Sequence, residues 1–173
     1  MLRLPMSLPP LENKTRWYYD ACALESTREV IREIANLREK YNTIALTSPL
    51  AIGEAYGACL RKARDKETPE ILEGFLELIK MLYDQNLLYV VGHDAAMEPY
   101  KKLLEMKKEI DNQRLQVGDI LHVATAIAFH CQHLITTDQD LLGFLPKKFS
   151  EVANHFGCTS FSCRSPLQKV KSA

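Results

Sequence analysis

The chain has 173 residues, 46% of them hydrophobic and 25% charged, which is typical of one folded globular domain and unlike a disordered chain. Basic and acidic residues number 22 each, so no net charge attracts the protein to nucleic acid or to a membrane surface. No segment approaches the ~20 consecutive apolar residues of a membrane span or resembles a signal peptide, so we expect a cytoplasmic protein that does not bind membranes.

The cysteines are odd in number and form no Cys-x-x-Cys pair or zinc-type spacing. We therefore expect reduced thiols at Cys22, Cys59, Cys131, Cys158 and Cys163. Prolines near the start and basic residues near the end predict an N-terminal arm over residues 1–14, a domain over residues 15–162 and a C-terminal tail over residues 163–173.

The first predicted elements are a strand and a helix. The aromatic-rich segment 16–19 predicts a short buried strand that ends at Asp20. Apolar positions at three- and four-residue spacing predict a helix over residues 26–41, with Ser26 as its N-cap and Glu29 completing a capping box.

A second strand and two more helices follow. Residues 43–47 predict the strand, and Ser48-Pro49 then marks the start of a helix that contains Glu54. Thr68-Pro69 repeats this start signal before a helix over residues 70–84. The remaining predicted elements are a strand at 87–91, a helix from Asp94 to 110, a helix opened by Asp119 over 120–131, a strand at 133–136 before a turn at Asp138, and a last strand at 159–162.

Strands that alternate with helices of this length predict an α/β fold, a three-layer α/β/α sandwich with a central, mostly parallel sheet. Ligands of such sheets bind at the carboxyl ends of the strands. Asp20 and Asp138 both follow predicted strands, so this topology brings them toward one edge.

Four acidic residues stand in apolar surroundings: Asp20, Glu54, Asp119 and Asp138. A buried, ionised carboxylate costs several kcal/mol or more unless a cation or hydrogen bonds stabilise it. Apart from Arg16, no lysine or arginine lies in these segments, so a bound metal ion is the simplest partner. Oxygen ligands of this kind favour Mg²⁺ or Mn²⁺.

Each acid also has a purely structural interpretation. Asp119 is a good helix N-cap, and Glu54 could pair with Arg61 or Lys62 or simply face water. Asp20 suits a turn after a strand, and Asp138 with Asp140 suits an ordinary polar turn.

The order of these acids resembles the PIN-domain nucleases, including VapC-like toxins. In that family an acid ends the first strand, a Glu lies in an early helix, and a D-x-x-H-x-A-T-A helix precedes a T-x-D-x-D turn. The matching segments here, over roughly residues 17–142, are Asp20-Ala-Cys-Ala-Leu, Thr47-Ser-Pro-Leu-Ala-Ile-Gly-Glu54, Asp119-Ile-Leu-His122-Val-Ala-Thr125-Ala and Thr136-Thr-Asp138-Gln-Asp140-Leu.

The resemblance implies a set of site residues. The metal ligands and catalytic acids would be Asp20, Glu54, Asp119 and Asp138, with Asp140 as an additional ligand. Thr136 would position phosphate or water, and His122 would be either a buried structural residue or a partner of the ligands. Cys22 departs from the Asn or Ser that often stands two residues after the first Asp of the family.

The resemblance also implies a function: an endoribonuclease that hydrolyses RNA phosphodiester bonds with Mg²⁺ or Mn²⁺. A toxin role would add an antitoxin partner and a homodimer. The segment Arg61-Lys62-Ala-Arg64 and the pair Lys147-Lys148 could contact the nucleic-acid backbone or simply face solvent.

Two alternatives remain open. A non-catalytic RNA-binding or scaffold protein would keep the fold without cleaving. An aspartyl-phosphate enzyme would use Asp20 for phosphotransfer, but a haloacid-type phosphatase needs a second Asp where Cys22 stands, and no lysine suited to a receiver domain follows the last strand.

Overall fold

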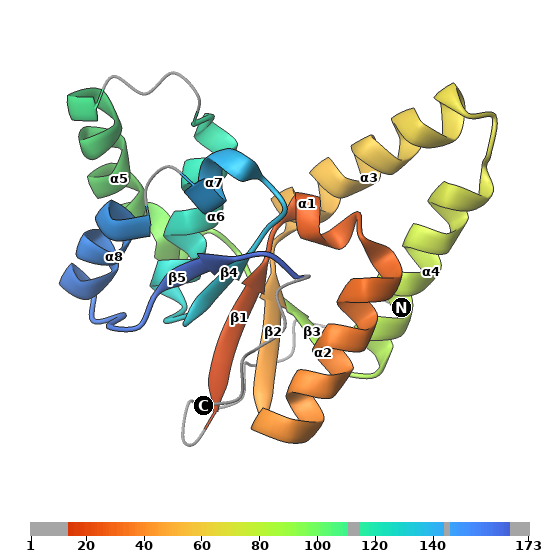
Figure 1. Cartoon of the computed structure of the whole chain (residues 1–173), viewed down its shortest axis with the longest axis horizontal. Helices are drawn as coiled ribbons and strands as arrows, with labels where there is room; N and C mark the ends of the chain where they lie inside the picture. The colour runs from red at the N-terminus through yellow and green to blue at the C-terminus, as the bar shows by residue number, and fades with distance from the viewer. Residues whose placement is uncertain (1–13, 111–114, 144–145, 167–173) are drawn as a thin grey trace.

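The computed structural model describes residues 14–110, 115–143 and 146–166. Its centre is a five-stranded, all-parallel sheet in the order β3-β2-β1-β4-β5 (Figure 1). The strands are β1 Thr15–Tyr19, β2 Thr43–Thr47, β3 Leu88–Val90, β4 His133–Ile135 and β5 Ser162–Arg164. The expected α/β fold with a parallel sheet is confirmed.

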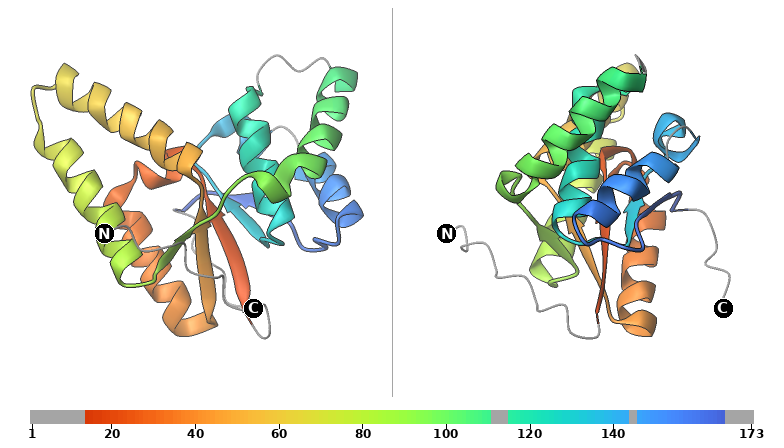
Figure 2. Two further views of the ribbon diagram at one scale, coloured as in Figure 1. Left: turned by 180° about the vertical axis from the view of Figure 1, so that it is seen from behind. Right: turned by 90° about the vertical axis from the view of Figure 1, so that its left-hand side faces the viewer.

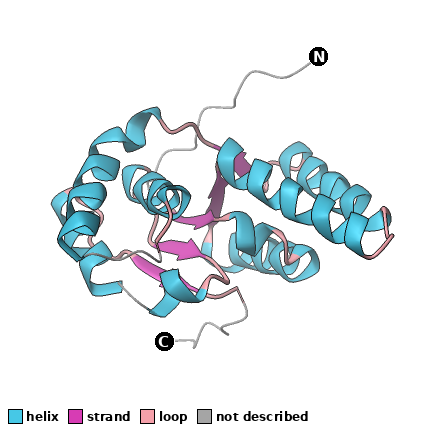
Figure 3. Cartoon of the chain, turned by 90° about the horizontal axis from the view of Figure 1, so that it is seen from above, coloured by secondary structure: helices cyan, strands magenta, loops and turns pink. Residues whose placement is uncertain are grey.

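Helices cover both faces of the sheet and form the outer layers of the sandwich (Figure 2). One layer holds α1 Ala21–Leu24, α2 Thr27–Tyr41, α3 Pro49–Asp65 and α4 Glu70–Asp84. The other holds the 3₁₀ turn η1 Asp94–Ala96 and helices α5 Met97–Ile110, α6 Val117–Ala128, α7 Gln139–Gly143 and α8 Pro146–His155. Seen from above, the strands lie side by side between the helices (Figure 3).

The strand side chains point alternately to the two faces of the sheet and form a hydrophobic core on each face. Tyr18 packs with Leu46, Ile120 and Val123 beneath α6, whereas Tyr19 packs with the helices of the opposite layer. Successive strand side chains point to opposite faces, and a parallel sheet covered on both sides buries both sets. Both tyrosines are fully buried, so their hydroxyl groups need partners inside the protein.

Several element boundaries differ from the sequence prediction. The helix expected from Asp94 begins as a 3₁₀ turn, and α5 proper starts at Met97. The last strand lies three residues later than predicted, at Ser162–Arg164, so the first residues of the expected C-terminal tail belong to the sheet. Residues 1–13 of the expected N-terminal arm and residues 167–173 of the expected tail lie outside the described residues.

The helix starts are partly as predicted. Ser48 caps α3 by accepting a hydrogen bond from the backbone N–H of Ala51. Ser26 holds the N-cap position of α2 without a side-chain capping bond, and the side chain of Glu29 lies outside the described part. The N-cap of α4 is Pro69, not Thr68, whose hydroxyl instead bonds the carbonyl of Lys66.

Candidate functional site

Three adjacent strands place polar residues at one edge of the sheet. Asp20 follows β1, Ser48 follows β2 and Thr136 follows β4, and β1 lies between the other two strands. The chain order reverses between β1 and β4, which makes this edge the topological switch point where open α/β sheets bind ligands. The expectation that Asp20 and Asp138 approach one edge of the sheet agrees with this order.

Asp20 is the most deeply buried acid of this edge, with 2% of its surface exposed. Its Oδ1 accepts a 2.8 Å hydrogen bond from the N–H of Ala23, so it is the N-cap of α1, a short helix that was not predicted. Burial raises the pKa of Asp20 to about 6, while hydrogen bonds from Thr136 and Ala23 partly offset that effect. The carboxylate is thus held in place while its charge is incompletely stabilised.

Thr136 joins two of the predicted acids. Its fully buried hydroxyl hydrogen-bonds Asp20 and accepts a 2.9 Å bond from the N–H of Asp138. The Thr136 hydroxyl thus contacts the carboxylate of Asp20 and the backbone of Asp138. That Thr136 positions phosphate or water stays a prediction.

Asp138 caps the next helix. Its Oδ1 accepts hydrogen bonds from the N–H groups of Asp140, at 2.7 Å, and Leu141, at 3.2 Å, at the start of α7. This is the geometry of an N-cap, in which one carboxylate oxygen serves the helix. The second oxygen of Asp138 lies outside these capping bonds.

Asp119 takes part in a capping box at the start of α6, but not as the N-cap that we predicted. Gln116 is the N-cap, and Asp119, three residues later, accepts a 2.8 Å hydrogen bond from the N–H of Gln116 through Oδ2. The helix therefore starts at Val117, three residues before the predicted start. Burial raises the pKa of Asp119, and the charges of Asp138 and Glu54 raise it further.

Glu54 and His122 form a polar pair between α3 and α6. The Nε2 atom of His122 lies 2.8 Å from Oε2 of Glu54, and the two side chains are 3% and 43% exposed, respectively. His122 is therefore buried and contacts Glu54, a geometry that is compatible with both interpretations considered for it. Glu54 pairs with this histidine rather than with Arg61 or Lys62, the partners considered from the sequence.

The pair continues into the core through Tyr18. The Nδ1 atom of His122 lies 3.0 Å from the Tyr18 hydroxyl, which donates a 2.7 Å hydrogen bond to Ser48. Ser48 is the N-cap of α3 and Glu54 lies within that helix, so this chain of bonds links α3 to the sheet and to α6.

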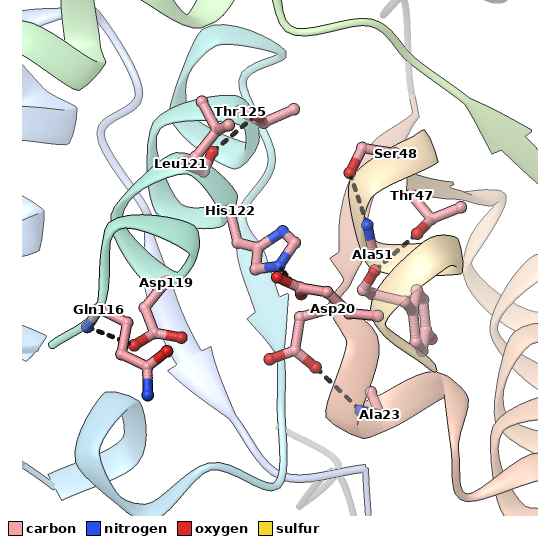
Figure 4. Close-up of polar contacts among 12 residues, drawn as sticks. Asp20, Ala23, Thr47, Ser48, Ala51, Gln116, Asp119, Leu121, His122 and Thr125 are labelled. Carbon is pink, nitrogen blue, oxygen red and sulfur yellow. Dashed lines mark hydrogen bonds and ion pairs between the residues drawn. The ribbon is translucent and has the colours of Figure 1, made fainter. Parts of the chain in front are cut away.

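The acids converge without forming a closed metal cage. Figure 4 shows Asp20, Asp119 and His122 pointing into the same space. Burial raises the pKa of both Asp20 and Asp119, and in each case the charge of Asp138 raises the pKa further while His122 lowers it, so both acids lie within electrostatic range of Asp138 and His122. Within residues 14–110, 115–143 and 146–166, however, no three acidic, histidine or cysteine side chains are arranged to hold an ion directly.

This donor set fits a hard cation that keeps part of its hydration shell. Mg²⁺ prefers oxygen ligands and is usually bound through one or two carboxylates, with water in several of its remaining positions. In the described part of the chain, no lysine or arginine forms an ion pair with Asp20. A divalent ion among Asp20, Asp119 and Asp138 would stabilise the charges that burial disfavours.

Other residues singled out in the sequence contribute less. Cys22 lies on α1, and burial followed by the charge of Asp20 raises its pKa to about 12, so it remains a neutral thiol. All five cysteines are unpaired, as expected. On α3, Lys62 forms an ion pair with Glu25 at the end of α1, and Arg64 forms one with its neighbour Asp65. The side chain of Lys147 lies outside the described residues.

Sequence reasoning missed Tyr18, Gly118 and the role of Ser48 beyond capping. Tyr18 lies two residues before Asp20, and strand periodicity places both side chains on the same face, which is a usable signal. Gly118 is the residue before Asp119, and a Cβ atom added there would lie 3.0 Å from Oε1 of Glu54. No local pattern indicated that Gly118 faces α3.

Comparisons with known proteins support the fold. The chain is similar to one in the solved structure of VapBC-1 from nontypeable Haemophilus influenzae, with a TM-score of 0.56 and 13% sequence identity. The match covers 89% of this chain and 100% of the other. No protein-family model matches the sequence, and neither does any curated protein. In the described part of the chain, no helix combines the length and apolar character needed to cross a membrane.

Proposed function

We propose that this protein is a metal-dependent endoribonuclease that hydrolyses RNA phosphodiester bonds with Mg²⁺ or Mn²⁺ at the edge formed by β1, β2 and β4. The observation that carries the proposal is the buried Asp20 carboxylate, whose raised pKa reflects incompletely stabilised charge beside Asp119 and Asp138. A divalent cation is the partner that this arrangement calls for. The resemblance of the acid order to PIN-domain nucleases agrees with this chemistry.

The side chains would divide the work as follows. Asp20, Asp119 and Asp138 would hold the ion, with Asp140 close to Asp138 on α7. Bound there, a divalent ion supplies an acidified water molecule and neutralises charge on the phosphate. Glu54 is the most exposed of the four acids, and its carboxylate is suited to accept a proton from the attacking water.

Preorganisation supports this assignment. Asp20, Asp119 and Asp138 each use a carboxylate oxygen to accept backbone N–H bonds at the start of a different helix. These bonds restrict the side chains before any ligand arrives, which lowers the cost of bringing like charges together around a cation. The same bonds explain why capping and catalysis need not be exclusive roles for Asp119.

The experiment is a cleavage assay on single-stranded RNA with the purified protein in Mn²⁺ or Mg²⁺ and in excess EDTA. We expect cleavage in the presence of metal and loss of cleavage in EDTA, because the carboxylates alone repel phosphate. Undiminished cleavage in EDTA would contradict the proposal. The same assay on single-stranded DNA determines whether the activity extends to DNA.

An antitoxin partner, a homodimer and a cytoplasmic location belong to the same proposal. Their support is the fold similarity to a chain of VapBC-1 together with the resemblance to VapC-like toxins. An apolar groove between α3 and α4, lined by Ile52, Tyr56, Leu76, Ile79 and Tyr83, offers a surface for a protein partner. Co-purification with the product of the neighbouring reading frame tests the antitoxin, and light scattering on the isolated protein tests the dimer.

A non-catalytic RNA-binding or scaffold protein is the second candidate. The observation in its favour is that no three ligands surround an ion directly within the described residues. RNA binding that is unchanged by Mn²⁺, with no cleavage, would favour this candidate. An aspartyl-phosphate enzyme fits less well, because Asp20 is almost fully buried and one of its oxygens caps α1.

A further inference from the structure

The carboxylate of Glu54 is constrained on two sides. Its Oε2 atom pairs with Nε2 of His122 at 2.8 Å. Its Oε1 atom lies against the backbone at Gly118, only 3.0 Å from the position that a Cβ atom would take there. A side chain larger than that of glycine at position 118 would thus crowd the Glu54 carboxylate, although this carboxylate is partly exposed to solvent.

His122, which contacts Glu54, is itself held by a hydrogen bond with Tyr18 on the sheet. Its ring is almost fully buried, and its Nδ1 atom lies 3.0 Å from the hydroxyl of Tyr18. That phenol belongs to the central strand β1, is fully buried and donates a hydrogen bond to Ser48. Neither ring nitrogen of His122 is left without a partner, so the ring cannot turn without breaking a bond in the core.

We propose that Tyr18, His122 and Gly118 are positioning residues that set the orientation of the Glu54 carboxylate for the reaction. This inference rests on the proposed function, in which Glu54 takes part in catalysis. Tyr18 and His122 act through a buried chain of hydrogen bonds, and Gly118 acts through the space that it leaves. Together they hold the Glu54 carboxylate of α3 in one orientation against α6.

The sequence offers a matched control for Tyr18. Tyr19 is also fully buried on β1, but its hydroxyl donates a 3.1 Å hydrogen bond to Glu33 on α2, in the opposite layer. Tyr18→Phe and Tyr19→Phe each remove one buried hydroxyl from the same strand. Only Tyr18→Phe removes a bond that leads to Glu54.

Gly118 has a matched control as well. Gly118→Ala places a methyl group against the end of the Glu54 side chain and removes no hydrogen bond. Gly74→Ala in α4 makes the same change at a helical glycine with no atom within 4 Å of the added Cβ. The methyl group would meet the flexible end of the Glu54 side chain rather than backbone, so we expect Gly118→Ala to fold normally and to push that carboxylate out of its place by a few tenths of an ångström.

The test measures kcat and KM for Mn²⁺-dependent RNA cleavage in the four variants and the unsubstituted protein, with circular dichroism as the check on folding. We expect kcat to fall about 10- to 100-fold in Tyr18→Phe and Gly118→Ala, because a misplaced catalytic group slows the reaction by up to about that factor, with KM for RNA nearly unchanged. Tyr19→Phe and Gly74→Ala should keep the unsubstituted rate. Full activity in a folded Gly118→Ala variant would overturn the proposal.

A second readout separates this inference from the proposed function. If the unsubstituted protein does not cleave RNA, the proposed function fails, and the ¹³C chemical shift of the Glu54 carboxyl group then tests the positioning alone. We expect this shift to move in Tyr18→Phe and Gly118→Ala and to stay in place in both controls. A shift that is unchanged in all four variants would refute the positioning role.

Discussion

Asp20→Asn tests the electrostatic argument about the site without any substrate. Asparagine retains an oxygen that can accept the hydrogen bond from the N–H of Ala23, so the cap of α1 is kept while the charge is removed. In the metal-free protein the pKa of Asp20 is raised from 3.8 to about 6, chiefly by burial. Because this pKa is higher in the folded state, ionisation of Asp20 favours the unfolded chain.

The magnitude follows from the size of that shift. Raising the pKa of Asp20 from 3.8 to about 6 means that its ionisation lowers the free energy of unfolding by about 3 kcal/mol, at about 1.4 kcal/mol for each pKa unit. The protonated Asp20 carboxyl group favours the folded state. This stabilisation is complete below the unfolded pKa of 3.8 and is lost as the pH rises through the folded pKa of about 6. At pH 7.5 we therefore expect the melting temperature of Asp20→Asn to exceed that of the unsubstituted protein by about 6–12 °C.

The measurement is a set of thermal and urea melts of both proteins in EDTA at pH 4.5 and pH 7.5. The stability gained by Asp20→Asn should be about three times larger at pH 7.5 than at pH 4.5, because Asp20 is largely protonated in the folded protein at the lower pH. A variant that is equally or less stable than the unsubstituted protein at both pH values would refute the reasoning. It would mean that the carboxylate is satisfied without a cation.

Two further acids give separate predictions. Asp119→Asn keeps an oxygen for the N–H of Gln116, so its melting temperature without metal should equal or exceed that of the unsubstituted protein. Differential scanning fluorimetry should also show a smaller rise in melting temperature on adding Mn²⁺. An undiminished rise would exclude Asp119 as a ligand. Asp138→Ala removes the cap of α7 and should lower the free energy of unfolding by about 1–2 kcal/mol in urea melts, whereas Asp138→Asn should keep most of that stability. Equal losses in the two variants would show that the cap is not what Asp138 contributes.

Much of the fold was predictable from local patterns. The apolar spacing of residues 26–41 and 70–84 predicted α2 and α4 nearly to the residue, and Ser48-Pro49 marked the start of α3. Such segments are long and strongly periodic, so local signals and tertiary packing agree. The four-residue helix α1 was not predicted, because a helix of one turn is too short to show a period.

The start of α6 shows where local rules compete. We expected Asp119 to be the N-cap because Asp is a favoured capping residue. In the structure Asp119 is the third residue of the helix and reaches back to Gln116, so the acid satisfies the helix start from inside. The capping-box rule has the same geometry, but Gln116 is not among the N-cap residues by which the rule is usually recognised.

The candidate site was predictable as a list of acids but not as a geometry. Local context selected Asp20, Glu54, Asp119 and Asp138 because each stands among apolar residues. The bonds that orient them join residues far apart in the chain, such as Tyr18 with His122, and they depend on which strands are neighbours in the sheet. A single sequence read in short windows carries no signal for such contacts.

The most direct test of the central claim is the rate of single-stranded RNA cleavage in Mn²⁺ by the unsubstituted protein, Asp119→Asn and Asp84→Asn, all purified in the same way. Asp84 is an exposed aspartate that pairs with Lys80 at the end of α4 and serves as the matched surface control. We expect Asp84→Asn to cleave at the unsubstituted rate and Asp119→Asn to be slower by orders of magnitude. Equal rates for all three proteins would contradict the assignment of cleavage to this cluster of carboxylates.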